Sequence, residues 1–184
     1  RVSSLIKKKK PNIKTIHFIA PKVWAWREGR IKKMKKYLDH ILLLFNFEKK
    51  YFDKEDLKSS FVGHPLLDKK DNENIQIDQL FNEKNIISIF PGSRESEIKI
   101  HTPILFDFIK KMNNKNNNYN YVIHSTDRYK DYLNVFLNNQ NISNVQIISD
   151  DKIKSAVIKK STFAVVKSGT VSLEVCKEGI PSII

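Results

Sequence analysis

The chain has 184 residues, 40% of them hydrophobic, which suffices for one packed domain or for one domain and part of another. Its 33 Lys and Arg residues exceed its 20 Asp and Glu residues, and the formal net charge of +13 favours a partner that carries phosphate. Nucleic acid, an anionic lipid surface and a nucleotide all meet that description, so charge alone does not choose among them.

Cysteine content and hydropathy indicate in which cellular compartment the chain is expected. Cys176 is the single cysteine, which excludes an intramolecular disulfide and a cysteine-built zinc site. The longest apolar run, Ile41 to Phe45, is far shorter than the ~20 residues that a membrane-spanning helix needs. We expect a cytosolic chain. Because it starts at Arg1 and stops inside the apolar run Ile180 to Ile184, we also expect it to be an internal piece of a longer protein.

The first part of the chain predicts a strand at Thr15 to Ile19, followed by a Trp-rich turn. A basic helix from about Arg27 to Tyr37 and a second strand at Ile41 to Phe45 are predicted after it. The helix has a narrow apolar stripe formed by Ile31, Met34 and Leu38, and its lysines face elsewhere, toward water or anions. From Leu66 to about Lys84 the chain turns polar, which indicates a linker with a short helix. We therefore place a domain boundary there, between residues 1–66 and 67–184.

The second part alternates short β-rich runs with longer amphipathic runs. The predicted strands are Ile86 to Phe90, Tyr119 to Ser125, Val145 to Ser149, Thr162 to Lys167 and Ile180 to Ile184. Apolar residues between them recur at helical spacing, and Asn113 to Asn118 indicates a solvated loop. Strands that are apolar at nearly every position and joined by helices favour a parallel sheet covered on both faces. We predict a Rossmann-like α/β domain.

Two turns of this domain have the residues of a phosphate site. After the first strand, Gly92 lets the backbone approach a ligand, the amides from Ser93 onward are expected to be unpaired at a helix N-terminus, and Arg94 adds a planar cation. The other interpretation is an ordinary strand-to-helix turn with a surface arginine. The motif alone does not decide between the two.

The second turn has the sequence Lys-Ser-Gly-Thr and precedes another predicted helix. Ser168 and Thr170 can donate hydroxyl hydrogen bonds, Gly169 admits a close approach, and the positive end of the helix points at the turn. Glu174 lies one helical turn after Thr170, where a carboxylate can accept from two ribose hydroxyls. The alternative is a capped helix with a solvated Glu174. Both turns follow strands of one parallel sheet, so we expect them at the same edge, where such sheets bind ligands.

Two other stretches are unusual. The segment around Trp24 and Trp26, with Arg27 beside them, is compatible with a packed corner, a membrane-surface wedge or a platform for stacking bases. His64, in Phe61-Val62-Gly63-His64-Pro65, could be catalytic or a hydrogen-bonding hinge residue, and a lone histidine favours the structural interpretation.

Taken in order, PKVWAWREGR, LLLFNFEKKYF, FVGHPL, IFPGSRESEI and VVKSGTVSLE are similar to the lipid-A-disaccharide synthase family, at similar separations and over essentially the whole chain. Two local departures stand out. Asn46 occupies a position where the family usually has proline, and Val171 and Ser172 replace small residues. Neither affects a proposed phosphate donor.

The resemblance implies a GT-B glycosyltransferase, with the end of an N-terminal acceptor-side domain followed by the first part of a C-terminal UDP-sugar-binding domain. It implies an inverting transfer from UDP-2,3-diacylglucosamine to 2,3-diacylglucosamine 1-phosphate, without metal or other cofactor. Cationic groups such as Arg94 would stabilise the departing UDP, Gly92, Ser93, Ser168, Gly169, Thr170 and Glu174 would bind it, and the general base would lie upstream of Arg1.

The acyl chains of both substrates imply peripheral attachment to the anionic cytoplasmic leaflet of the inner membrane, and the resemblance leaves a homodimer open. Two alternatives remain at this point. One is another GT-B UDP-sugar enzyme, such as a peptidoglycan N-acetylglucosaminyltransferase or a UDP-sugar epimerase. The other is a basic nucleic-acid-binding module, which lacks a docking motif here.

Overall fold

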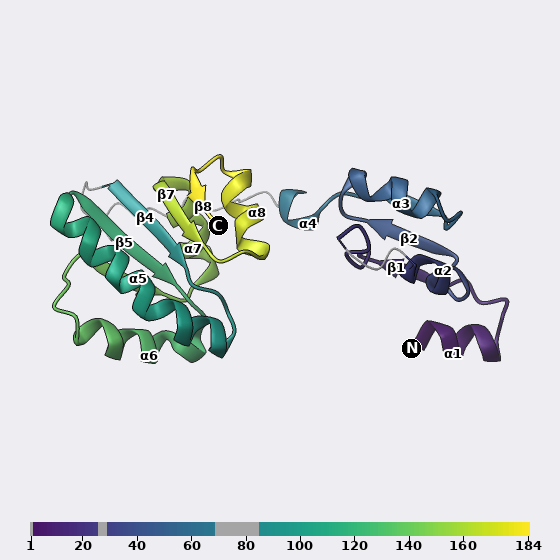
Figure 1. Cartoon of the computed structure of the whole chain (residues 1–184), viewed down its shortest axis with the longest axis horizontal. Helices are drawn as coiled ribbons and strands as arrows, with labels where there is room; N and C mark the ends of the chain where they lie inside the picture. The colour runs from purple at the N-terminus through teal and green to yellow at the C-terminus, as the bar shows by residue number, and fades with distance from the viewer. Residues whose placement is uncertain (1, 26–28, 69–84) are drawn as a thin grey trace. The chain divides into compact units, whose positions relative to one another are not determined.

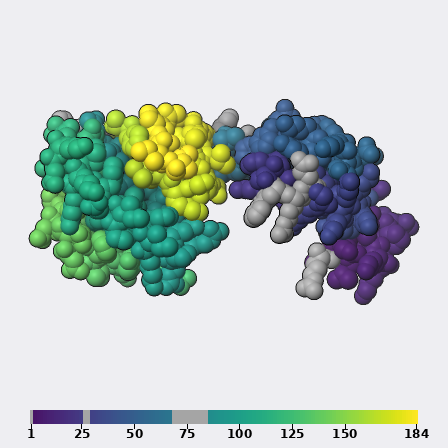
Figure 2. Space-filling view, in the orientation of Figure 1, coloured from purple at the N-terminus to yellow at the C-terminus, as the bar shows by residue number. Residues whose placement is uncertain are grey.

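The structure is a computed structural model that describes residues 2–25, 29–68 and 85–184. The chain divides into two compact units, Arg1–Lys69 and Lys70–Ile184 (Figure 1 and Figure 2). Trp26 and Arg27 lie outside the described residues, as does most of the predicted linker with its short helix. The assignment of the two units to an acceptor side and a UDP side stays a prediction.

The first unit is a small parallel sheet with helices. Its elements are α1 (Val2–Lys9), β1 (Ile16–Phe18), α2 (Arg30–Lys35), β2 (His40–Leu43), the 3₁₀ turn η1 (Asn46–Glu48), α3 (Lys49–Asp53), β3 (Ser59–Phe61) and α4 (Pro65–Asp68). The strand order is β1-β2-β3, and both pairings are parallel. The predicted stripe of α2 is buried, with Ile31, Met34 and Leu38 packed on Ile41 and Leu43 of the central strand.

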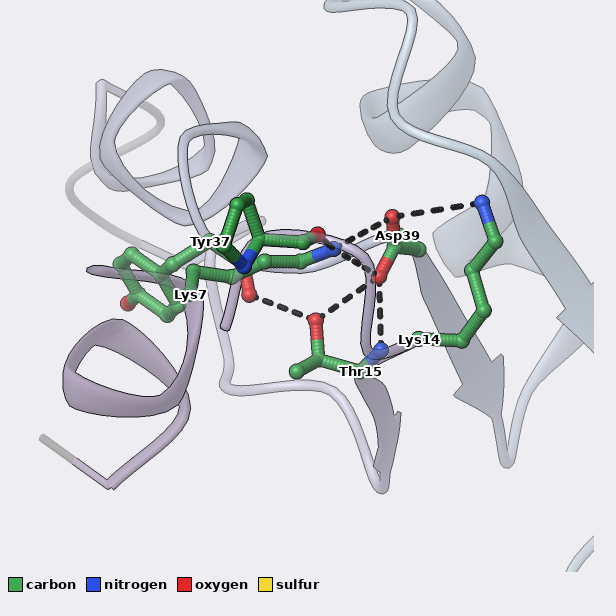
Figure 3. Close-up of polar contacts among 6 residues, drawn as sticks. Lys7, Lys14, Thr15, Tyr37 and Asp39 are labelled. Carbon is green, nitrogen blue, oxygen red and sulfur yellow. Dashed lines mark hydrogen bonds and ion pairs between the residues drawn. The ribbon is translucent and has the colours of Figure 1, made fainter. Parts of the chain in front are cut away.

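Polar contacts, rather than burial, attach α1 to this sheet, since none of its residues is buried. The Nζ of Lys7 lies 2.8 Å from Oδ2 of Asp39, which also accepts a 2.6 Å hydrogen bond from the amide of Thr15 (Figure 3). The hydroxyl of Thr15 donates to the carbonyl of Tyr37 at 2.7 Å. The hydrogen bond from Lys7, followed by that from the Thr15 amide, holds the pKa of the Asp39 carboxyl well below its usual value. Asp39 thus connects the end of α1 to the starts of β1 and β2.

The second unit contains β4 (Asn85–Phe90), α5 (Glu95–Lys115), β5 (Tyr119–His124), α6 (Asp127–Asn138), β6 (Val145–Ile148), α7 (Asp151–Lys160), β7 (Ser161–Val166), α8 (Thr170–Lys177) and β8 (Ser182–Ile183). All neighbouring strands are parallel, in the order β6-β5-β4-β7-β8. The predicted α/β fold class is confirmed.

Alternate residues of the central strand β4 pack on opposite sides. Ile87 and Ile89 belong to a cluster with residues of α5 and α6, whereas Phe90 packs with residues of α7 and α8. Because both faces of β4 are covered, nearly every position of the strand is apolar, as the sequence indicated. The chain leaves β4 through α5 toward β5 and returns through α7 to β7 on the other side of β4. The strand order therefore reverses between β4 and β7, which is where open α/β sheets bind ligands.

Part of the loop prediction is wrong. Residues 113–115 continue α5, which ends at Lys115. The amides of Asn113 and Asn144 exchange two 2.9 Å hydrogen bonds, so the end of this helix is fastened to the segment before β6. Pro103 lies inside α5.

Among the described residues, no helix combines the length and the apolar character needed to cross a membrane.

Candidate phosphate-binding site

Two turns lie side by side at the carboxyl edge of the second sheet. The parallel pairing of β4 with β7 places Phe90 opposite Val166, so the Pro91–Arg94 turn and the Lys167–Gly169 turn start at the same level. The amide of Lys167 donates a 2.9 Å hydrogen bond to the carbonyl of Phe90, which extends that pairing into the turns. The predicted proximity of the two turns is thereby confirmed.

The first turn is closed by a carboxylate of its own helix. Oε2 of Glu97 accepts from the amide of Ser93 at 3.1 Å and from the amide of Arg94 at 3.2 Å. The expectation that these amides are unpaired is therefore wrong. Glu97 lies in the first turn of α5, where a carboxylate is favoured because it can accept from the free amides of a helix start.

Gly92 makes room for this carboxylate. Its φ of +115° lies in a region that side chains rarely adopt, and a Cβ at this position would come within 2.5 Å of Oε2 of Glu97. A ring nitrogen of His101 lies 2.6 Å from the carbonyl of Pro91, which can only accept, so the histidine N–H donates. The turn is therefore held from within α5 at two points.

Glu97 also contacts two cations. Oε1 lies 2.8 Å from the guanidinium of Arg94 and 2.9 Å from Nζ of Lys167, while the Glu97 side chain is 15% exposed. The hydrogen bond from Lys167, with those from the Ser93 amide and from Arg94, lowers the pKa of Glu97 to about 2. The Arg94 side chain is 74% exposed, so its guanidinium remains able to contact a ligand.

The second turn is open by comparison. Ser168, Gly169 and Thr170 are exposed, and α8 starts at Thr170 without a side chain capping it. A Cβ on Gly169 would meet a single atom within 4 Å, the Lys167 carbonyl oxygen at 3.9 Å. The backbone at Gly169 is extended, with φ at 168°, so the glycine leaves space here without being required by the conformation. The free amides at the start of α8 suit an anion.

Glu174 is neither solvated nor free of partners. Lys154 of α7, whose side chain is 12% exposed, lies 3.0 Å from Oε2 of Glu174 and 3.0 Å from Asp151. His124, at the end of β5, lies 3.6 Å from the same Asp151, and burial lowers its pKa. A carboxylate has about four acceptor positions, so Glu174 can hold Lys154 and still accept from a ligand hydroxyl.

The first unit, described by itself, has a partly exposed pair of aromatic side chains. Trp24 packs edge-on against Phe47 at 5.4 Å between ring centroids, and their exposed fractions are 40% and 49%. Nδ1 of His64 accepts from the amide of Leu66 at 3.2 Å, which agrees with the structural interpretation of this histidine. Nowhere in the described parts of the chain do three or more His, Cys, Asp or Glu side chains form a group that could hold a metal ion.

Comparison with known families settles the relationship. A family model described as lipid-A-disaccharide synthetase matches residues 1–184. The chain belongs to this family. A lipid-A-disaccharide synthase of Coxiella burnetii is 36% identical over 182 residues, covering 96% of this chain and 47% of that protein, and one of Persephonella marina is 35% identical over 185 residues. The chain thus spans about half the length of these relatives.

Solved structures confirm the fold type. The S. aureus MnaA–UDP co-structure covers 98% of this chain and 52% of its own, with a TM-score of 0.69 and 14% identity. UDP-GlcNAc 2-epimerase from Neisseria meningitidis gives 0.67 and 16%, and E. coli ADP-heptose lps heptosyltransferase II gives 0.51 and 11%. Such low identities bear on the fold alone, which is that of GT-B transferases and related epimerases. Family membership disfavours both the other UDP-sugar enzymes and the nucleic-acid module as alternatives.

Proposed function

We propose that the longer polypeptide containing this chain is an inverting glycosyltransferase that joins UDP-2,3-diacylglucosamine to 2,3-diacylglucosamine 1-phosphate and releases lipid A disaccharide 1-phosphate and UDP. The observation that carries the proposal is family membership over residues 1–184. The general base is expected outside the present sequence, and no cofactor is proposed.

Within this reaction, the second unit supplies the UDP site. The open start of α8 and the hydroxyls of Ser168 and Thr170 suit the diphosphate, and Glu174 suits the ribose hydroxyls. Gly92 and Ser93 contribute by shaping the neighbouring turn, because the Ser93 amide is held by Glu97. This arrangement uses fixed backbone dipoles and side chains to receive charge on the departing UDP.

Arg94 is the proposed cation for the transition state. Its guanidinium is planar and permanently charged, it is largely exposed, and it stands at the edge where β4 and β7 end. It can therefore form two parallel hydrogen bonds to a phosphate, either on the leaving diphosphate or on the acceptor.

Calorimetry with UDP on the 184-residue chain tests the assignment of the site. Glu174→Ala is expected to weaken UDP binding by about 10-fold or more, since hydrogen bonds to a charged group contribute about 1.5–3 kcal/mol. Glu178→Ala, one helical turn farther from the open end of α8, is the matched control and should change the affinity less than 2-fold, that is, by less than about 0.4 kcal/mol. Equal losses in the two variants would contradict the assignment.

Peripheral attachment to an anionic lipid surface is proposed for the first unit. Lys32, Lys33, Lys35 and Lys36 are exposed on and just after α2, and Trp24 and Phe47 are partly exposed. Lysines attract anionic headgroups and aromatic rings enter the interface. Flotation with phosphatidylglycerol vesicles, compared with phosphatidylcholine vesicles, measures this, and equal recovery with both would contradict it. A homodimer of the longer polypeptide is to be tested by light scattering.

A further inference from the structure

Glu97 occupies a position that neither the phosphate site nor helix capping explains by itself. Glu95 and Glu97 both lie in the first turn of α5, yet Glu95 pairs at the surface with Lys99 and Arg128, with a side chain 51% exposed. Glu97 is 15% exposed and its two oxygens have different partners. Oε2 accepts from two amides of the first turn, while Oε1 accepts from one cation of each turn.

The arrangement at Oε1 has an electrostatic consequence. The guanidinium of Arg94 and the ammonium of Lys167 both lie within 3 Å of the same oxygen, so two like charges are held close together. Without a carboxylate between them, they would repel and take separate rotamers in water. The hydrogen bond from the Lys167 amide to the Phe90 carbonyl fixes the backbones of the two turns relative to each other. It does not hold the side chains of Arg94 and Lys167, which could still turn away.

We propose that Glu97 is a positioning residue that bridges the two turns, holding the Arg94 guanidinium and the Lys167 ammonium together beside the open start of α8. The proposal rests on the assignment of UDP to that turn. Glu97 itself does not contact the ligand. It fixes two cations before the diphosphate arrives, so that less side-chain freedom is lost on binding.

The requirement for glycine at position 92 indicates that the Glu97 carboxylate stays in place when a ligand binds, and that it is not displaced by a phosphate. Oε2 lies so close to Gly92 that a Cβ at residue 92 would be 2.5 Å from it. An incoming phosphate that replaced the Glu97 carboxylate would have to break its contacts with two amides and two cations. The first turn is therefore a fixed support for the two cations, and the second turn, at the start of α8, is the part that binds the diphosphate.

A double-variant cycle in the 184-residue chain tests the bridge. The affinity for UDP is measured for the wild type, Glu97→Gln, Lys167→Met and the double variant, with Glu95→Gln as the matched control and a melting curve for each. Glu97→Gln is expected to weaken UDP about 10-fold, as for a lost charge-assisted hydrogen bond, and Glu95→Gln less than 2-fold. The double variant should bind more tightly than the product of the two single losses predicts, because both act through Lys167.

Three results would overturn the inference: an unchanged affinity in Glu97→Gln, an equal loss in Glu95→Gln, or additive losses in the double variant. If the wild type does not bind UDP, the proposed function fails instead, and the bridge is then judged by carboxyl NMR. The pKa of Glu97 should rise in Lys167→Met while that of Glu95 stays unchanged. A constant Glu97 pKa would refute the bridge without reference to any ligand.

Discussion

Arg94 carries the most direct prediction for catalysis. In a polypeptide of the relatives' full length, Arg94→Ala should lower turnover about 10²-fold or more, by analogy with removal of one transition-state donor. Arg94→Lys keeps the charge but loses the planar two-point contact, so it should be impaired less. A rate assay with both lipid substrates measures this.

A melting curve for each Arg94 variant serves as the control. The side chain is 74% exposed, so the melting temperature should change little. Near-normal turnover in Arg94→Ala would make Arg94 a surface residue of an ordinary turn, and a collapsed melting temperature would make it structural.

Three glycines give a graded prediction for stability. Gly92 has a positive φ and no space for a Cβ, Gly179 has a positive φ and open space, and Gly29 has open space with φ at −57°. Alanine at position 92 should therefore lower the melting temperature most, and strain of this kind costs about 1–3 kcal/mol. Alanine at position 179 should have a smaller effect, and at position 29 almost none. Thermal melts of the three variants check the order, and a Gly92→Ala melt as high as that of Gly29→Ala would contradict the crowding argument.

At the scale of elements, attachment of α1 through Asp39 predicts a response to acid. The folded pKa of Asp39 is depressed, so its contribution to stability is present above its unfolded pKa of about 3.9 and is lost as pH falls toward the folded pKa. Asp39→Asn removes the ion pair with Lys7 at every pH and should expose α1 to trypsin at neutral pH. Its stability should also fall less steeply than that of the wild type below about pH 4.

Limited trypsinolysis and acid melts measure both effects, and Asp107→Asn is the control, since Asp107 pairs with Lys111 at the surface of α5. Wild-type cleavage kinetics in Asp39→Asn would show that α1 is held by other contacts.

Elements of the second unit could be predicted from the sequence because their patterns are strong. β4 is apolar at nearly every position and starts one residue before the predicted Ile86, and α5 has helical spacing over many residues and lies where a helix was expected. The first unit was harder. β3 is three residues, two of them serine, and α1 is a lysine-rich helix without buried residues, so neither has a hydrophobic period to recognise.

The candidate site also has features that the sequence could predict and contacts that it could not. The two turns and their adjacency follow from local sequence and from the parallel sheet. The contacts of Lys154 with Glu174 and of Lys167 with Glu97 join residues 20 and 70 positions apart, and local spacing cannot indicate them. Glu97 had one available signal, its place three residues after the N-cap Arg94, which is typical of a carboxylate that accepts from helix-start amides.

At the scale of the whole molecule, the length of the chain bears on activity. It spans 47% of the Coxiella burnetii relative, and transfer requires donor carbon, acceptor hydroxyl and base to be held together. We therefore predict that the purified 184-residue chain binds UDP but forms no lipid disaccharide. A product assay with both lipid substrates, run beside the calorimetry, checks this, and disaccharide formed by the chain would refute it.

Pro103 inside α5 has a consequence for local opening of the helix. Proline lacks an amide hydrogen, so the carbonyl of Lys99 receives no bond from residue 103, and the ladder is interrupted there. The turns before this break carry Glu97 and His101, whose side chains fasten the Pro91–Arg94 segment. In hydrogen exchange, the α5 amides before Pro103 are therefore expected to open separately from the amides after it and to be less protected. Their protection should rise when UDP occupies the neighbouring Lys167–Gly169 turn.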